Sequence, residues 1–376
     1  MSNKTSIGGN TLTRRREPLT DTNLLSTITI CIFFAMYLTA MLIWGRGFLN
    51  PQRFINLFEA ANATLIIISC GLTIVMISGG IDISVGGVVA LVTMSGAVYL
   101  NGEGATVFGL VCLALGIGAA FGLVQGFLIA YLKIQPFIVT LAGMFFARGM
   151  VTIVSPLQVK VTEEVHPAFF RLHELRFDLP EFLGTVGRTG NFIPARIRIG
   201  AIAAIAVVII IFAVLKWSRP GRNFYAVGGN SQSALLLGIN VDRTKFFAHL
   251  ICSLLAGIGG LVFLLSAAGA TAADARFFEM RAIASSIIGG TLLTGGVGNV
   301  IGTLFGSLTL LTIDQIVLTS GLREPWWQQI TTGALLTFFI LLQSIVLSVR
   351  GKGGIKSMIP EWMKIKIKIT QQDGPR

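Results

Sequence analysis

Long apolar runs alternate with short polar segments along most of the chain. A helix that crosses the bilayer needs about 20 mostly apolar residues, and this rule predicts about ten spans. They fall near residues 24–44, 60–78, 84–100, 106–132, 137–154, 197–217, 246–268, 280–293, 297–320 and 326–348. The pattern therefore predicts an all-α polytopic membrane protein. Its transmembrane domain covers 24–348, between polar tails at 1–23 and 349–376.

Two glycine-rich segments interrupt the apolar pattern at similar places in the two halves of the chain. The first is SGGIDISVGGVVALVTMSGAV, residues 78–98, and the second is IGGTLLTGGVGNVIGTLFGSL, residues 288–308. Matching glycine interruptions in two halves indicate broken helices beside a transport path. Close packing of small residues is the other interpretation. We predict two pseudo-repeat halves, each with a broken helix, because irregular backbone at membrane depth needs protein or water around it.

Asp82 lies inside the first of these interruptions. An acid at the centre of a lipid-exposed helix costs about 2.5–3.5 kcal/mol on insertion scales, so we expect Asp82 to face the bundle interior. It precedes the span that begins near Ser84, and a negative charge is favourable at a helix N-terminus. We expect first a structural role, second contact with a transported ligand, and third a proton relay. Few acids lie in the spans, which makes a relay the weakest of the three.

Other ionisable groups within the spans are sparse. Arg148 falls in the fifth span and Asp314 in the ninth, while His249 falls near the start of the seventh and is expected at the membrane interface. A carrier driven by an ion gradient often has ionisable clusters at mid-membrane. The sequence offers little of this kind. It also has no GxxxxGK[ST] phosphate loop, so a nucleotide that drives transport must be bound by another chain.

Composition supports a membrane protein and excludes a soluble one. Of the 376 residues, 53% are hydrophobic and 12% are charged, against about 25% charged in an ordinary soluble domain. The net charge of +12 comes mostly from Lys and Arg that flank apolar runs, which predicts membrane orientation and no nucleic-acid partner. An N-terminus inside gives the inner segments more Lys and Arg, so both termini are expected in the cytoplasm. The polar residues 1–23 show no secretory leader, and the first span is expected to be retained.

The cysteines and histidines do not form a pattern typical of metal sites. Cys31, Cys70, Cys112 and Cys252 all lie in apolar segments, and we expect small buried side chains without disulfides. His166 and His173 lie in the long polar loop 155–196, which is expected to form a small folded cap outside the membrane. A metal site would need better ligand spacing. The basic tail is interpreted either as lying on anionic lipid or as solvated.

The inner loop 218–245 contains a short segment with clear start and stop signals. Asn230 and Ser231 are favourable N-cap residues, and SQSALLL is predicted to be a short helix that ends at Gly238. Its Leu235–Leu237 run needs a cover. The cover is either the chain's own bundle or a groove in a partner subunit.

Four ordered blocks resemble a known family over about 50–348. SGGIDISVG, KIQPFIVTLAGMFFARG, RNFYAVGGNSQSALLLGINVDRTK and AIASSIIGGTLLTGGVGNVIGTLFG are similar to the permease subunits of ATP-binding-cassette sugar importers. The subfamily is that of the ribose, xylose, galactofuranose and autoinducer-2 permeases. The likeness is greatest to the galactofuranose permeases, through TLAGMFFARG and GGTLLTGGVG. The loop 155–196 and the basic tail match poorly and take no function from the resemblance.

The resemblance implies a transport subunit with no catalytic residue and no cofactor of its own. ATP is bound by a separate ATPase, and a sugar-binding protein outside the membrane delivers the substrate. Two permease chains, alike or unlike, assemble in the lipid of a bacterial cytoplasmic membrane. The residues that resemble the coupling helix, which docks on the ATPase, are Gly228, Gly229, Asn230, Ser231, Ala234, Leu235, Gly238 and Ile239.

A translocation path through the bundle needs polar or aromatic side chains that face its centre. The candidates are Asn62, Asp82, Ser84, Gln125, Phe145 and Asn299. A forgiving cavity is expected, because the binding protein supplies selectivity. Two other functions stay open on the residues alone. An ion-coupled secondary carrier would need an essential acid or cation site at mid-membrane. A membrane enzyme would need a polar cluster at interface depth, and the three histidines are scattered.

Overall fold

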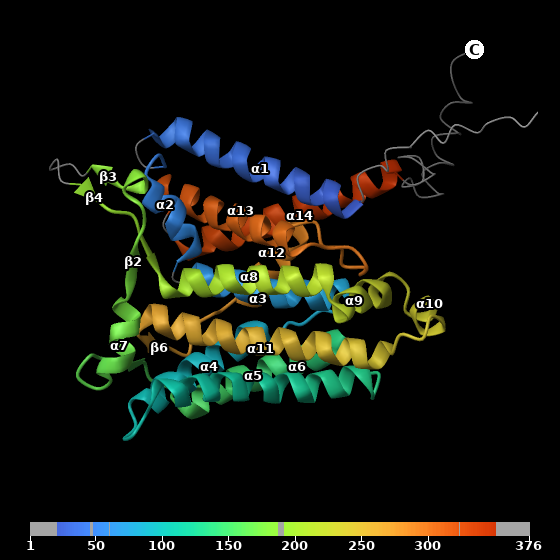
Figure 1. Ribbon diagram of the computed structural model, residues 1–376, viewed down its shortest axis with the longest axis horizontal. Coiled ribbons are helices and arrows are strands. Elements are labelled where there is room, and N and C mark those ends of the chain that lie inside the picture. The colour runs from blue at the N-terminus through green and yellow to red at the C-terminus, as the bar shows by residue number, and fades with distance from the viewer. Residues whose placement is uncertain (1–20, 46–47, 60, 187–191, 323, 351–376) are drawn as a thin grey trace, which may run out of the picture.

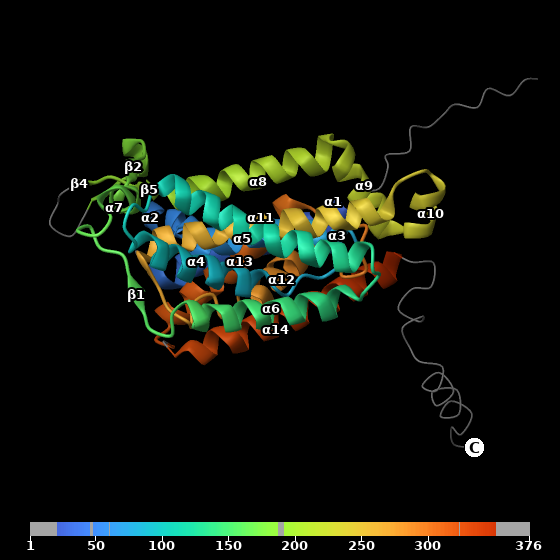
Figure 2. The same cartoon turned by 90° about the horizontal axis from the view of Figure 1, so that it is seen from below.

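The protein is a bundle of long helices that run roughly side by side (Figure 1). The computed structural model describes residues 21–45, 48–59, 61–186, 192–322 and 324–350. Most of the two predicted tails, 1–20 and 351–376, lies outside these ranges. In the view turned by 90°, α8 runs along one edge of the bundle and α14 along the opposite edge (Figure 2).

Each of the ten predicted spans coincides with a helix. These helices are α1 (Asp21–Trp44), α3 (Ala61–Ile77), α4 (Val85–Leu100), α5 (Val107–Ala130), α6 (Pro136–Val154), α8 (Ile199–Trp217), α11 (Val241–Ala267), α12 (Phe278–Ile288), α13 (Val300–Thr319) and α14 (Pro325–Arg350). Shorter helices fill the connections: α2 (Pro51–Ile55), η2 (Asn56–Phe58), α7 (Pro167–Glu174), η3 (Glu181–Leu183), α9 (Arg219–Gly229) and α10 (Ser231–Leu236).

Seven helices in the described part of the chain are long and apolar enough to cross a membrane. An eighth span results if Pro51–Phe58 and Ala61–Ile77, bent by 50°, are taken together. The remaining two are shorter. α12 has 11 residues, so it rises about 16 Å, roughly half of a 30 Å hydrocarbon core. The chain is a multi-pass membrane protein, and the relation between its two halves as repeats stays a prediction.

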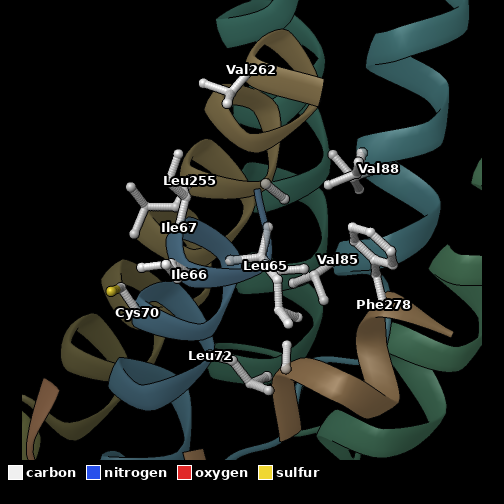
Figure 3. Packing of buried hydrophobic residues seen from close by; sticks show 14 of the residues in the cluster. Leu65, Ile66, Ile67, Cys70, Leu72, Val85, Val88, Leu255, Val262 and Phe278 are labelled. Carbon is white, nitrogen blue, oxygen red and sulfur yellow. The ribbon is translucent and has the colours of Figure 1, made fainter. Parts of the chain in front are cut away.

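Helix α3 forms the centre of the bundle. Its sequence is apolar on every side, which is typical of a helix surrounded by other helices, and Ala63 to Ile77 are all buried. Figure 3 shows Leu65, Ile66 and Leu72 of α3 among side chains from α4, α11 and α12. The first broken helix therefore starts from the most enclosed element of the fold.

The two ends of the bundle differ. At one end, the described residues of the loop predicted at 155–196, namely 155–186 and 192–196, form a small folded cap with α7 and short strands (Figure 1). In the cap, β2 (Arg176–Asp178) pairs with β5 (Arg196–Arg198), and β3 (Thr185–Val186) pairs with β4 (Phe192–Ile193), both antiparallel. The third pair joins β1 (Val159–Lys160) to β6 (Gly269–Ala270), which anchors the cap on the end of α11. At the other end lie α9, α10, the start of α1 and the end of α14 (Figure 1).

The expectation that all four cysteines are buried is wrong for two of them. Cys70 and Cys252 are buried in α3 and α11, whereas Cys31 and Cys112 are exposed on the outer faces of α1 and α5. In a membrane-spanning helix the outward face is as apolar as the inward one. Hydrophobicity therefore does not distinguish the two positions.

Candidate functional site

The predicted short helix of the inner loop forms as α10. The Asn230 side chain caps it by accepting a hydrogen bond from Ser233 N at 2.9 Å, and Gly238 follows it with a φ of +80°. Ile239 N donates to Ala234 O at 3.0 Å and closes the last turn. Start and stop lie where the sequence predicts them, because both signals are local.

One face of this element is apolar and uncovered. Ala234 is buried against the chain, whereas Leu236 is 89% exposed and Leu235 and Leu237 are exposed beside it. A groove of about 520 Å³ runs next to them, lined among others by Lys133, Gln232 and Ile239. Within the part of the chain that the structure describes, the bundle therefore does not cover these leucines. A contiguous apolar surface of this kind is typical of a protein–protein contact.

The predicted path residues at the first break form a buried polar cluster. Asp82 Oδ1 accepts hydrogen bonds from Ser84 N at 2.9 Å and from Ser84 Oγ at 2.6 Å, directly before α4. Ser84 Oγ also lies 3.1 Å from Gln125 Oε1 of α5. Asp82 and Ser84 are fully buried, and Gln125 is nearly so. This geometry agrees with the expected placement of Asp82 at a helix N-terminus inside the bundle.

His249, which the sequence places near the start of the seventh span, is enclosed by the bundle. It is 1% exposed, and its Nδ1 lies 3.8 Å from Asp82 Oδ2. Neither of these two atoms has a hydrogen-bond partner among the described residues. Helix α11 begins at Val241, earlier than the apolar run, so His249 lies about two turns into the helix, and its depth in the membrane stays a prediction.

At the second break, Asn299 caps α13 and does not point freely into a path. Its side-chain oxygen accepts a hydrogen bond from Ile301 N at 3.0 Å. A cluster of hydroxyl groups lies nearby that sequence analysis missed. Thr73 Oγ1 lies 2.7 Å from Thr303 Oγ1 and 3.1 Å from Ser286 Oγ, joining α3, α12 and α13. Single Thr and Ser residues in apolar helices do not indicate in the sequence that their hydroxyl groups come together in the fold.

Arg148 holds the loop that leads into α12. Its guanidinium donates to Asp274 O and to Ala275 O, both at 2.6 Å. Ala275 and Phe277 in that loop have positive φ, a backbone conformation that is unfavourable for residues with a side chain. Glu279, which sequence analysis missed, is buried next to Gly86 of α4.

Asp314 in α13, the second acid that the sequence places within a span, forms an ion pair with Arg281 of α12. With Asp82 and Glu279, it is one of the buried acids between the broken helices and their neighbours. Asp82 and Asp314 therefore each face a basic residue, as buried acids usually do.

Two other predicted path residues lie elsewhere. Phe145 is 65% exposed and points away from the bundle, so its expected position at the centre is wrong. The buried face of α6 is formed by Val139, Thr140, Ala147 and Val151. At about 100° per residue, Phe145 lies about 200° around the helix axis from Ala147, on the opposite side of the helix. Asn62, near the start of α3, donates to Asn56 O at 3.0 Å and closes a turn.

The described residues contain no group of three His, Cys, Asp or Glu side chains that could hold a metal. The cap histidines are held by backbone contacts. His166 Nδ1 accepts a hydrogen bond from Phe169 N at 3.0 Å, and His173 Nδ1 lies 2.7 Å from Leu265 O.

Comparison with known proteins also indicates a membrane transport subunit. Residues 57–340 match the family described as Branched-chain amino acid transport system / permease component. The Inner membrane ABC transporter permease protein YjfF of Escherichia coli (strain K12) is 37% identical over 85% of this chain and 92% of its own length. The Fructose import permease protein FruG of Bifidobacterium longum (strain NCC 2705) is 31% identical over 88% and 94%. The Ribose import permease protein RbsC of Escherichia coli (strain K12) is 32% identical over 79% and 88%.

No solved structure matches the chain. The family match covers most of the sequence, and these relatives are aligned over nearly their whole length. The chain therefore belongs to the Branched-chain amino acid transport system / permease component family and is a membrane-spanning permease of an ATP-binding-cassette importer.

Proposed function

We propose that this chain forms the path by which a monosaccharide enters a bacterial cell, driven by ATP hydrolysis on a separate subunit. The observation that carries the proposal is α10, a capped helix that exposes three consecutive leucines at one end of the bundle. A short helix of this shape fits a groove on a partner protein. Two of the relatives named above are a ribose and a fructose import permease, which supports a sugar as cargo.

In this proposal the end of the bundle with α10 lies in the cytoplasm, together with both chain termini. The cap with α7 then lies outside the cell and faces the sugar-binding protein. Lys133, Lys216, Arg219 and Arg222 lie toward the α10 end, in agreement with the excess of positive charge on cytoplasmic segments.

The translocation path is proposed to run along the two breaks, between α3 and α4 and between α12 and α13. Asp82, Ser84, Gln125 and Asn299 lie there, and their hydrogen bonds support a role in shaping the breaks. A second permease chain, alike or unlike, completes the path. The surface of this chain that contacts the second permease chain is formed by outward-facing residues such as Phe145.

The test is affinity purification of the tagged chain from its own host in mild detergent, followed by mass spectrometry. An ATPase subunit with a phosphate-loop motif is expected in the sample, and a second permease sequence would identify an unlike pair. A chain that purifies alone and transports in ATP-free vesicles under an ion gradient would refute the proposal in favour of a secondary carrier. The sugar is then sought by uptake assays that begin with galactofuranose, ribose and fructose.

A further inference from the structure

Glycines from three segments meet at one place near the α10 end of the bundle. Gly79 belongs to the first break, Gly228 and Gly229 end α9, and Gly295 and Gly296 belong to the second break. We call this set the glycine junction. It lies one residue from the start of α10, because only Asn230 separates α9 from α10.

The backbones in the junction are in direct contact. A Cβ on Gly228 would overlap the carbonyl oxygen of Ile77 and lie 2.6 Å from Gly296 N. A Cβ on Gly295 would lie 2.9 Å from Gly79 Cα, and one on Gly296 would lie 2.6 Å from Gly229 Cα. Gly228, Gly295 and Gly296 therefore cannot accept a side chain unless the neighbouring backbone shifts.

Two hydrogen bonds tie the same segments together. Gly296 N donates to Ile77 O at 2.9 Å, which joins the second break to the end of α3. The hydroxyl of Tyr225, on α9, donates to Gly298 O at 2.9 Å and joins α9 to the second break. The second break is therefore hydrogen-bonded both to α3 and to α9, and the backbone of α9 is in contact with both breaks.

We propose that the glycine junction transmits movement of α10 to both broken helices, and that Gly228 and Tyr225 are the positioning residues of this connection. The inference rests on the proposed function, in which α10 docks on an ATPase. Backbones in van der Waals contact leave no soft side chain between them to absorb a displacement. Gly79, Gly295 and Gly296 have φ of +83°, +87° and +74°, so the hinge points are residues that change conformation at little cost.

Packing alone is the alternative explanation, and a helical glycine outside the junction provides the control. Gly116 lies in α5, and a Cβ there would meet nothing within 4 Å. Gly116→Ala is therefore a control matched in residue type and in helical setting. Tyr225→Phe removes one hydrogen bond without adding an atom to the junction.

The experiment uses the chain purified with its ATPase subunit and reconstituted in liposomes. A cysteine introduced by Leu293→Cys, an exposed position in the second break, reports on the break through its rate of reaction with a water-soluble maleimide. The exposed Cys31 and Cys112 are first replaced by Ser, and the buried Cys70 and Cys252 are left in place. The rate is measured with and without ATP plus vanadate, so no knowledge of the sugar is required.

We expect nucleotide trapping to change the labelling rate in this background and with Gly116→Ala. Mutations along a coupling network change coupling by about 2- to 30-fold. Gly228→Ala is expected to remove most of the response while the ATPase remains bound and active, and Tyr225→Phe to remove part of it.

A full nucleotide response in both Gly228→Ala and Tyr225→Phe would overturn the inference, as would an absent response in the background chain with the ATPase bound. If Gly228→Ala does not accumulate, Tyr225→Phe decides the question. If the unmutated chain retains no ATPase, that result refutes the proposed function. It does not test the inference about the glycine junction.

Discussion

Replacing Asp82 by Ala should destabilise the bundle more than replacing any exposed acid of the chain. The substitution removes the acceptor of both Ser84 hydrogen bonds and leaves His249 Nδ1 facing the space left by the carboxylate. Hydrogen bonds to charged groups contribute about 1.5–3 kcal/mol each. Loss of the two from Ser84 is therefore expected to cost about 3–6 kcal/mol.

The assay is thermal unfolding of the purified chain in detergent, followed by size-exclusion chromatography of heated samples. A loss of this size corresponds to a decrease in Tm of about 5 °C or more. The control is Asp242→Ala. Asp242 pairs with Lys133 at the surface, where an ion pair contributes at most about 1 kcal/mol, so its Tm should change by no more than about 2 °C.

Asp82→Asn separates charge from shape at the same position. The amide oxygen can still accept from Ser84, so we expect a smaller decrease in Tm than for Ala. Equal Tm values for Asp82→Ala and Asp242→Ala would refute the structural role of Asp82. Abolished uptake at an unchanged Tm would instead make Asp82 a residue of the transport path.

Three further substitutions test other parts of the structure. Leu236→Asp should leave expression and Tm unchanged, because the side chain is 89% exposed, but should reduce the amount of ATPase that co-purifies; equal recovery of ATPase would contradict the docking role of α10. Arg148→Ala should lower Tm, because two loop carbonyls lose their hydrogen-bond donor, and Arg148→Lys should recover part of the loss. A Tm for Arg148→Ala equal to that of the unmutated chain would show that Arg148 does not stabilise the loop. Arg281→Ala should cost about 3–5 kcal/mol by leaving Asp314 unpaired, and adding Asp314→Ala should restore part of it, measured as Tm; additive losses would exclude the pair.

Features encoded within a few residues could be predicted from the sequence. The ten apolar runs all became helices, and α10 begins after Asn230 and ends before Gly238 as its caps indicate. The breaks were also visible, because glycine interrupts an otherwise apolar pattern. The strands of the cap were not predicted, since segments of two or three residues are too short to show alternation.

Contacts between distant segments could not be predicted in this way. The pairing of Asp82 with His249 depends on how α11 packs beside the first break, and no local pattern encodes that. The position of Phe145 depends on the rotation of α6. In a membrane helix this rotation is hidden, because lipid-facing and core-facing residues are equally apolar. The glycine junction likewise needs three segments that only the fold brings together.

Uptake by reconstituted vesicles distinguishes ATP-driven import from transport driven by an ion gradient. The chain is incorporated with its ATPase into liposomes, the sugar-binding protein and a radiolabelled monosaccharide are added outside, and uptake is measured with ATP or with an ion gradient. The account predicts accumulation that requires ATP in the lumen and the binding protein outside, and that is lost with Leu236→Asp. Accumulation driven by the ion gradient without ATP would contradict it.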